Sequence, residues 1–184
     1  FYNWARSGGG EPYNSYGNGS AMRVSPVAYA ARDEQDCLAL AEESAAVTHD
    51  HPEGIKGAQA TAWATWTALQ GQSAGIIRKE IEGRFGYDLH RDWFSGYEFD
   101  VTRQGTVPPA LICALDANDY EDFIRQAVSI GGDTDTICAI GGAVAEALYG
   151  IPDTIISETR ARLDTFLLDI IDQFERRFIR RVAD

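Results

Sequence analysis

The stretch from Ser129 to Gly150 constrains the fold more than any other segment, because a glycine-rich acidic turn leads into a helix of small residues. Ile137, Ile140, Val144 and Leu148 are spaced by three or four residues, which predicts one apolar stripe on a helix. Small side chains beside that stripe would let another helix approach closely: Ala139, Gly142, Ala143 and Ala147. Gly141 and Gly142 each cost about 0.5–1 kcal/mol relative to alanine inside a helix, so their presence predicts close packing.

The turn before that helix has the sequence G-G-D-T-D-T. Gly131 and Gly132 supply the backbone freedom that lets Asp133 and Asp135 converge from a helix entry turn. Together with the Thr136 hydroxyl, these carboxylates form an oxygen-rich corner of the kind that binds a hard cation such as Mg²⁺. An acidic N-cap on a core helix is the simpler interpretation, because Asp and Thr are ordinary capping residues. The residues alone leave both interpretations open.

Several short motifs with known chemistry do not match. A phosphate-binding loop requires a lysine that the glycine-rich approach lacks. Ile137 and Cys138 occupy positions where an EF-hand requires an oxygen ligand and a glycine. The alternating strands and helices of a haloacid-dehalogenase-type phosphatase are missing, and His49 and His51 have no third zinc ligand at a matching spacing.

Composition limits the class of protein. A chain of 184 residues that is 45% hydrophobic can bury a sizeable core, and we expect one domain over residues 1–184. The formal net charge of −12 argues against a nucleic-acid partner, which would need a basic face. No apolar run approaches the ~18 residues of a membrane-spanning helix, so we expect no membrane partner. Cys37, Cys113 and Cys138 lack paired spacing, which predicts reduced core thiols in a cytoplasmic protein.

Helical periodicity continues along most of the chain, and no convincing alternating strand occurs, so the predicted fold is all-α. A loop is expected over Tyr87–Gly105, and a helix starting at Val107-Pro108-Pro109 follows it. The remaining predicted helices lie near Met22–Ala30, after Asp33, from Pro52 to Leu69, over Ile76–Phe85, after Asn118 or Asp119, and in the tail Ser157–Val182. The apolar tail suits packing within the chain or against a second subunit of a homodimer.

Two further segments have ligand-binding and structural interpretations of similar weight. Tyr13–Ser20 is rich in Gly, Asn and Tyr, which suits a loop that offers backbone amides to a ligand, or a flexible connector. His49 precedes a predicted helix, where it is either a helix-cap or turn residue, or a hydrogen-bond donor to a ligand.

Four motifs follow one another along the chain: S-Y-G-N-G-S-A-M-R-V-S-P (15–26), T-H-x-H-P-x-G-x-x-G-A (48–58), V-P-x-A-L (107–111) and I-G-G-D-T-D-T-x-x-A-I-x-G (130–142). In this order they resemble the ADP-ribosylglycohydrolase family, the all-α hydrolases related to dinitrogenase reductase-activating glycohydrolase. The resemblance implies a compact orthogonal helical bundle with two Mg²⁺ ions, or Mn²⁺ in their place. It also implies hydrolysis of the glycosidic bond between ADP-ribose and a protein side chain or small acceptor.

The resemblance also implies roles for individual residues. Asp133 and Asp135 match catalytic positions, and with Thr136 they match metal ligands of the family. A loop that holds ADP-ribose is matched by Ser15, Tyr16, Gly17, Asn18 and Gly19, with Met22 and Arg23 completing its motif. His49 matches the histidine of a ligand-facing turn.

One departure from the family pattern concerns the other half of the metal site. Family members have a T-D-D-[ST] motif and a nearby glutamate before the matched region, whereas this chain contains no Asp-Asp pair. The chain begins with Phe1 rather than Met, and we expect the matched part to be the C-terminal two-thirds of the family domain. The alternatives to hydrolysis are an inactive ADP-ribose-binding module, one half of a split enzyme with a complementing N-terminal polypeptide, and a helical scaffold without this activity.

Overall fold

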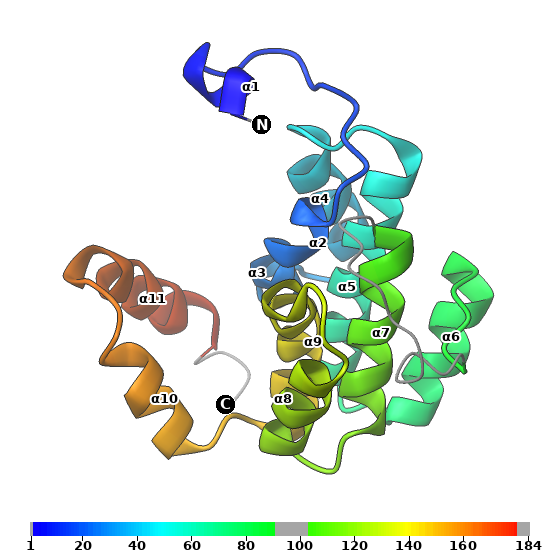
Figure 1. Cartoon of the computed structure of the whole chain (residues 1–184), viewed down its shortest axis with the longest axis vertical. Coiled ribbons are helices and arrows are strands. Elements are labelled where there is room, and N and C mark those ends of the chain that lie inside the picture. Colours follow the sequence, from blue (N-terminus) through cyan, green and yellow to red (C-terminus); the bar gives the residue numbers. More distant parts are fainter. Residues whose placement is uncertain (1, 91–102, 180–184) are drawn as a thin grey trace. The chain divides into compact units, whose positions relative to one another are not determined.

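The computed structural model describes residues 2–90 and 103–179, and this part of the chain contains helices and no strand (Figure 1). The helices are α1 (Tyr2–Arg6), α2 (Gly19–Met22), α3 (Ser25–Ala30), α4 (Glu34–Ala46), α5 (Pro52–Leu69), α6 (Ala74–Phe85), α7 (Arg103–Asp116), α8 (Tyr120–Ser129), α9 (Thr134–Tyr149), α10 (Asp153–Arg160) and α11 (Thr165–Phe178). The predicted all-α class is confirmed.

The chain divides into two compact units, Phe1–Tyr149 and Gly150–Asp184. The first unit contains α1–α9 and all the candidate site residues, whereas the second contains α10 and α11. A single domain over residues 1–184 stays a prediction.

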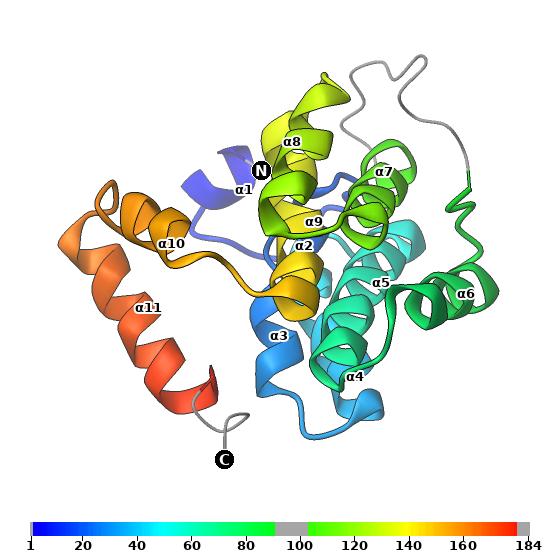
Figure 2. The same ribbon diagram turned by 90° about the horizontal axis from the view of Figure 1, so that it is seen from below.

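Helix α5 lies at the centre of the first unit and packs against α2, α3, α4, α6, α7 and α9. Figures 1 and 2 show α5, α7 and α9 side by side. Most residues of α5 are buried, and many of them are alanines whose small side chains let neighbouring helices approach from several sides. The alanine-rich sequence therefore explains why this helix, rather than a more bulky one, forms the middle of the bundle.

Predicted helix boundaries agree well where a capping residue defines them. Asp33 and Asp119 accept hydrogen bonds from the backbone N–H groups at the third helical positions of α4 and α8. His51 caps α5, with Pro52 in its first turn, and Gly86 ends α6 in the left-handed conformation. These polar caps are local in sequence, which is why they could be recognised without knowledge of the tertiary structure.

Helix α9 confirms the close packing that its small residues predict. A Cβ atom added to Gly141 would lie 2.5 Å from the carbonyl oxygen of Ala110 in α7 and 2.6 Å from Cε2 of Phe123 in α8. At Gly142 the nearest such atom, the Tyr120 hydroxyl oxygen, is 3.5 Å away, an ordinary contact. Gly141 is thus the residue that brings the α9 backbone against α7.

The predicted start of α7 is wrong by one turn. The helix begins at Arg103 instead of Val107, so residues 103–105 belong to it and not to the expected loop, while residues 91–102 lie outside the described chain. Pro108 and Pro109 therefore sit inside the helix, where they remove the N–H donors for the carbonyls of residues 104 and 105. The prediction that these prolines start the helix was wrong because the fixed φ of proline fits any helical position, including one after the helix has begun.

The second unit contains two helices where the predicted tail, Ser157–Val182, suggested one helical run. Asp164 interrupts it by accepting a hydrogen bond from the Leu167 N–H, 2.8 Å away, which makes Asp164 the N-cap of α11. The Arg160 guanidinium of α10 forms ion pairs with Asp172 and Glu175 of α11. A local cap thus overrides the continuous apolar periodicity.

The sequence predicts no membrane-spanning helix and three reduced cysteines, and the structure bears on both expectations. None of the described helices is long and apolar enough to cross a membrane. All three cysteines are free thiols, and burial raises the pKa of Cys37 and Cys113 to about 12. Both thiols therefore stay protonated at neutral pH and are poor nucleophiles.

The close packing at Gly141 can be tested by comparing alanine substitutions at Gly141 and at the neighbouring Gly142. We expect Gly141→Ala to lower the free energy of unfolding by about 1–3 kcal/mol, because the added methyl group overlaps backbone and ring atoms. Gly142→Ala is the matched control and should change stability little, or raise it by up to about 1 kcal/mol through helix propensity. Urea denaturation followed by circular dichroism measures both; equal effects would contradict the packing role of Gly141.

Candidate functional site

The acidic turn before α9 has the backbone geometry that its glycines predict. Gly131 and Gly132 have φ angles of 80° and 68°, the left-handed region that side chains disfavour. The Asp133 carbonyl accepts the first helical hydrogen bond from Ile137, at 3.0 Å, so Asp133 directly precedes α9. Asp135 lies in the first turn, where the helix dipole favours a negative charge, and its carboxylate accepts from the Thr136 N–H at 2.9 Å.

The Ser15–Gly19 loop lies against this acidic corner. Asn18 Nδ2 donates a hydrogen bond to Asp133 Oδ2 at 3.0 Å, and the same nitrogen approaches Thr106 Oγ1 of α7 at 3.4 Å. A second link joins the Thr136 hydroxyl to the sulfur of Met22, 3.7 Å away. Residues about 115 positions apart in sequence are thereby brought into one site.

The same loop also lies over the turn between α4 and α5. Asn14 N–H donates to Asp50 Oδ1 at 2.7 Å, and Ser15 N–H donates to the Thr48 carbonyl at 3.4 Å. From the start of α5, Gly54 approaches both segments, since a Cβ there would lie 2.7 Å from the His49 carbonyl oxygen and 2.9 Å from that of Ser15. A residue with any side chain at position 54 would push these segments apart.

His49 is buried at the centre of this turn, with only 6% of its surface exposed. Its Nδ1 lies 2.7 Å from Thr48 Oγ1, and Arg23 Nη2 donates to the same hydroxyl at 2.9 Å. The other edge of the imidazole faces Gly19, where an added Cβ would lie 3.4 Å from Nε2. His49 therefore contacts the glycine-rich loop, whereas His51 is the helix cap.

Tyr16, Gly17 and Gly19 of the Ser15–Gly19 loop differ in exposure and in their contacts. Tyr16 is 57% exposed, and its ring lies 5.8 Å from that of His51 between centroids. Neither Gly17 nor Gly19 has a positive φ. The Gly17 N–H is 3.3 Å from Ser15 Oγ, to which it donates, so this amide already has a partner within the loop. At Gly19, an added Cβ would lie 3.4 Å from His49 Nε2, about the distance of an ordinary van der Waals contact.

The acidic corner provides oxygen ligands of the type a hard cation requires, but few of them. Asp133 is partly buried, Asp135 is exposed and Thr136 is buried. Within residues 2–90 and 103–179, no group of three or more His, Cys, Asp or Glu side chains is placed to hold a metal ion. The donor set therefore fits Mg²⁺ in chemical kind, and additional ligands would have to complete it.

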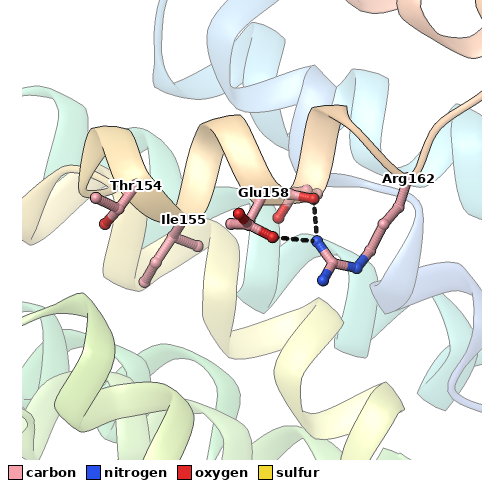
Figure 3. Close-up of a pocket in the computed structure, with 5 residues that line it drawn as sticks. Thr154, Ile155, Glu158 and Arg162 are labelled. Carbon is pink, nitrogen blue, oxygen red and sulfur yellow. Dashed lines mark hydrogen bonds and ion pairs between the residues drawn. The ribbon is translucent and has the colours of Figure 1, made fainter.

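A surface hollow in the second unit involves none of these residues. Thr154, Ile155, Glu158, Thr159 and Arg162 line it, all on or just after α10 (Figure 3). The Arg162 guanidinium forms an ion pair with Glu158 at 2.9 Å, so its charge is already balanced. We assign no ligand to this hollow.

Comparison with known protein families matches residues 1–183 to the ADP-ribosylglycohydrolase family. The chain belongs to this family. ADP-ribosylhydrolase ARH3 of Homo sapiens is 31% identical over 186 aligned positions, which cover 74% of this chain and 51% of the relative. The ADP-ribosyl-[dinitrogen reductase] glycohydrolase of Rhodospirillum rubrum is 26% identical, with 74% and 47% covered.

A solved structure agrees with the family assignment. The chain is similar to an ADP-ribosylglycohydrolase-related protein complex, with a TM-score of 0.70, 27% sequence identity, and coverage of 83% of this chain and 58% of the other. The predicted helical architecture of the ADP-ribosylglycohydrolase family is thus confirmed over part of its length. The chain spans about half the length of the curated relatives it matches.

Within this family framework, the structure brings together most of the residues singled out from the sequence. The Ser15–Gly19 loop contacts Asp133 through Asn18 and His49 through Gly19. Sequence reasoning missed the contributions of Thr106 and Thr48. Thr106 directly precedes the V-P-x-A-L motif and Thr48 begins the T-H-x-H motif, so position beside a matched motif was the available signal.

The close approach at Gly54 generates a prediction about both stability and the site. We expect Gly54→Ala to lower the free energy of unfolding by about 1–3 kcal/mol, because the new methyl group would overlap two backbone carbonyls. Gly75→Ala is the control, since Gly75 also lies in the first turn of a helix but faces open space. Chemical denaturation compares the two; a Gly54 variant as stable as the Gly75 variant would contradict the described contact.

Proposed function

We propose that this chain binds ADP-ribose at the site formed by the Ser15–Gly19 loop, the turn at His49 and the corner Asp133–Thr136. We further propose that the complete site hydrolyses the glycosidic bond between ADP-ribose and a protein side chain or small acceptor. The observation that carries the proposal is the 3.0 Å hydrogen bond between Asn18 Nδ2 and Asp133 Oδ2, because it joins the loop to the acidic corner. Membership of the ADP-ribosylglycohydrolase family supports the choice of ligand.

In this proposal, Asp133, Asp135 and Thr136 hold Mg²⁺. When bound, the cation supplies Lewis-acid chemistry toward ribose oxygens and a water molecule. Neither carboxylate forms an ion pair among the described residues, so both charges remain available to a cation. The side-chain amide of Asn18 orients one Asp133 oxygen, which leaves the carboxylate fixed before a cation arrives.

The remaining residues are proposed to bind the nucleotide part of the ligand. The exposed ring of Tyr16 can stack against the base or ribose, as aromatic faces commonly do. Backbone amides of the glycine-rich loop suit the diphosphate because they neutralise negative charge without basic side chains. His49 lies beside Gly19 and can donate a hydrogen bond to a ligand oxygen in this loop.

A second candidate function is ADP-ribose binding without hydrolysis. The specific observation in its favour is that the corner supplies two carboxylates, and no larger acidic cluster is found in the described chain. Two Mg²⁺ ions would require more oxygen ligands than this corner offers. A third candidate is a split enzyme, in which a separate polypeptide supplies the other acidic ligands of the metal site.

Calorimetry and a hydrolysis assay distinguish these functions. We expect the chain to bind ADP-ribose in the presence of Mg²⁺, and we expect release of ADP-ribose from ADP-ribosylated peptides, measured by chromatography. The glycohydrolase of Rhodospirillum rubrum, assayed in parallel on its own substrate, serves as the positive control. Binding without release would favour the binding module or the split enzyme, whereas absence of both would overturn the proposal.

Substitution of the acidic corner tests its role directly. We expect Asp133→Asn or Asp135→Asn to lower kcat/KM at least about 100-fold, or ~2.7 kcal/mol, because each change removes a charged oxygen ligand. Electron paramagnetic resonance with Mn²⁺ provides a readout that does not require activity, and both variants should lose bound Mn²⁺.

Asp153→Asn is the matched control for these variants. Asp153 is also an exposed carboxylate in the first turn of a helix, but it lies outside the proposed site. The control should retain Mn²⁺ binding, and its stability should fall by no more than about 1 kcal/mol, the usual contribution of a charge near a helix terminus. Unchanged Mn²⁺ binding in both corner variants would remove the metal role assigned here.

A further inference from the structure

We propose that Arg23 and Thr48 are positioning residues that hold the His49 imidazole with its proton on Nε2, directed at the Ser15–Gly19 loop. This inference deepens the proposed function and rests on it for the identity of the ligand. The evidence is a chain of short polar contacts that runs from the guanidinium through one hydroxyl to one ring nitrogen.

The first step concerns Arg23. Its guanidinium can only donate hydrogen bonds, and Nη2 does so to Thr48 Oγ1 at 2.9 Å, to the Ser44 carbonyl at 2.9 Å and to the Ala45 carbonyl at 3.4 Å. The two carbonyls belong to the last turn of α4, where a cation also interacts favourably with the helix dipole. The two protons of Nη2 are therefore shared among three acceptors, and Thr48, which faces a group that can only donate, must accept its hydrogen bond.

The second step concerns the single proton of the Thr48 hydroxyl. Thr48 is 3% exposed, so its hydroxyl depends on protein partners rather than on bulk water. Within the described chain, the acceptor within reach of this proton is His49 Nδ1, at 2.7 Å. The alternative, with a proton on Nδ1, would leave the buried hydroxyl proton without an acceptor and is therefore disfavoured.

The third step follows from the ring itself. A neutral imidazole that accepts at Nδ1 carries its proton on Nε2 and donates there. Nε2 lies on the edge that faces Gly19, where an added Cβ would be 3.4 Å away. The Nε2 donor consequently lies on the side of the ring nearest Gly19, within the loop proposed to hold ADP-ribose.

Nitrogen-15 nuclear magnetic resonance of the imidazole rings tests the assignment on the free protein. The chain has three histidines, His49, His51 and His90, so the ring spectrum is simple to assign. We expect the wild-type His49 ring to show an unprotonated, hydrogen-bonded Nδ1 and a protonated Nε2. A wild-type ring with its proton on Nδ1 would overturn the proposal, even if no variant folds.

Paired variants separate positioning from general structural damage. Thr48→Val keeps the shape but removes the hydroxyl, and it should change the His49 ring signals while leaving those of His90 in place. It should also weaken ADP-ribose binding about tenfold, the usual effect of losing one buried hydrogen bond. Thr48→Ser restores the hydroxyl and should return both the ring signals and the affinity close to those of the wild type.

The outcomes distinguish this inference from the proposed function. Unchanged His49 signals in Thr48→Val, or failure of Thr48→Ser to restore them, would overturn the positioning role whatever the ligand. Wild-type protein with the expected ring signals but no affinity for ADP-ribose would instead contradict the proposed function and support the positioning of His49 alone.

Discussion

The close contact between α9 and α7 at Gly141 determines where the acidic corner lies. Because the Ala110 carbonyl occupies the space of a side chain, α9 can approach α7 there only with glycine. This contact fixes the position of α9, and Asp133 directly precedes its first turn. Thr106, on the preceding turn of the same helix α7, then approaches the Asn18 amide that binds Asp133. Backbone packing and site geometry are therefore set by the same pair of helices.

A similar constraint operates on the other side of the loop. Gly54 brings the start of α5 against the His49 and Ser15 carbonyls, and the Ser20 hydroxyl donates to the Gly54 carbonyl at 2.9 Å. The Ser15–Gly19 loop is thus held on this side by contacts with Gly54, in addition to the hydrogen bonds of Ser15 with Thr48 and of Asn18 with Asp133. Such a loop can present amides and an exposed tyrosine while its ends remain fixed, which suits recognition of a nucleotide.

Local sequence signals predicted much of the fold, because most of the helices have caps and apolar stripes. Asp33, Asp119 and Gly86 mark boundaries through bonds to neighbouring residues, and these boundaries were predicted well. The start of α7 was missed because Pro108 and Pro109 lie inside a helix that begins one turn earlier, where sequence rules disfavour proline. The break at Asp164 was missed because a single cap interrupts a continuous apolar stripe. In the site, Thr48 interacts with Arg23 and Thr106 with Asn18. Both partners are distant in sequence, so the periodicity of apolar residues does not reveal these contacts.

The electrostatics of the site place a condition on any ADP-ribose complex. The chain has a formal net charge of −12, and a diphosphate brings further negative charge beside Asp133 and Asp135. Arg23, the basic residue of the loop motif, donates to α4 carbonyls and to Thr48. Backbone amides offset only part of this repulsion. A cation at the corner would therefore bring together two anionic groups that otherwise repel, so binding of metal and binding of ADP-ribose should be coupled.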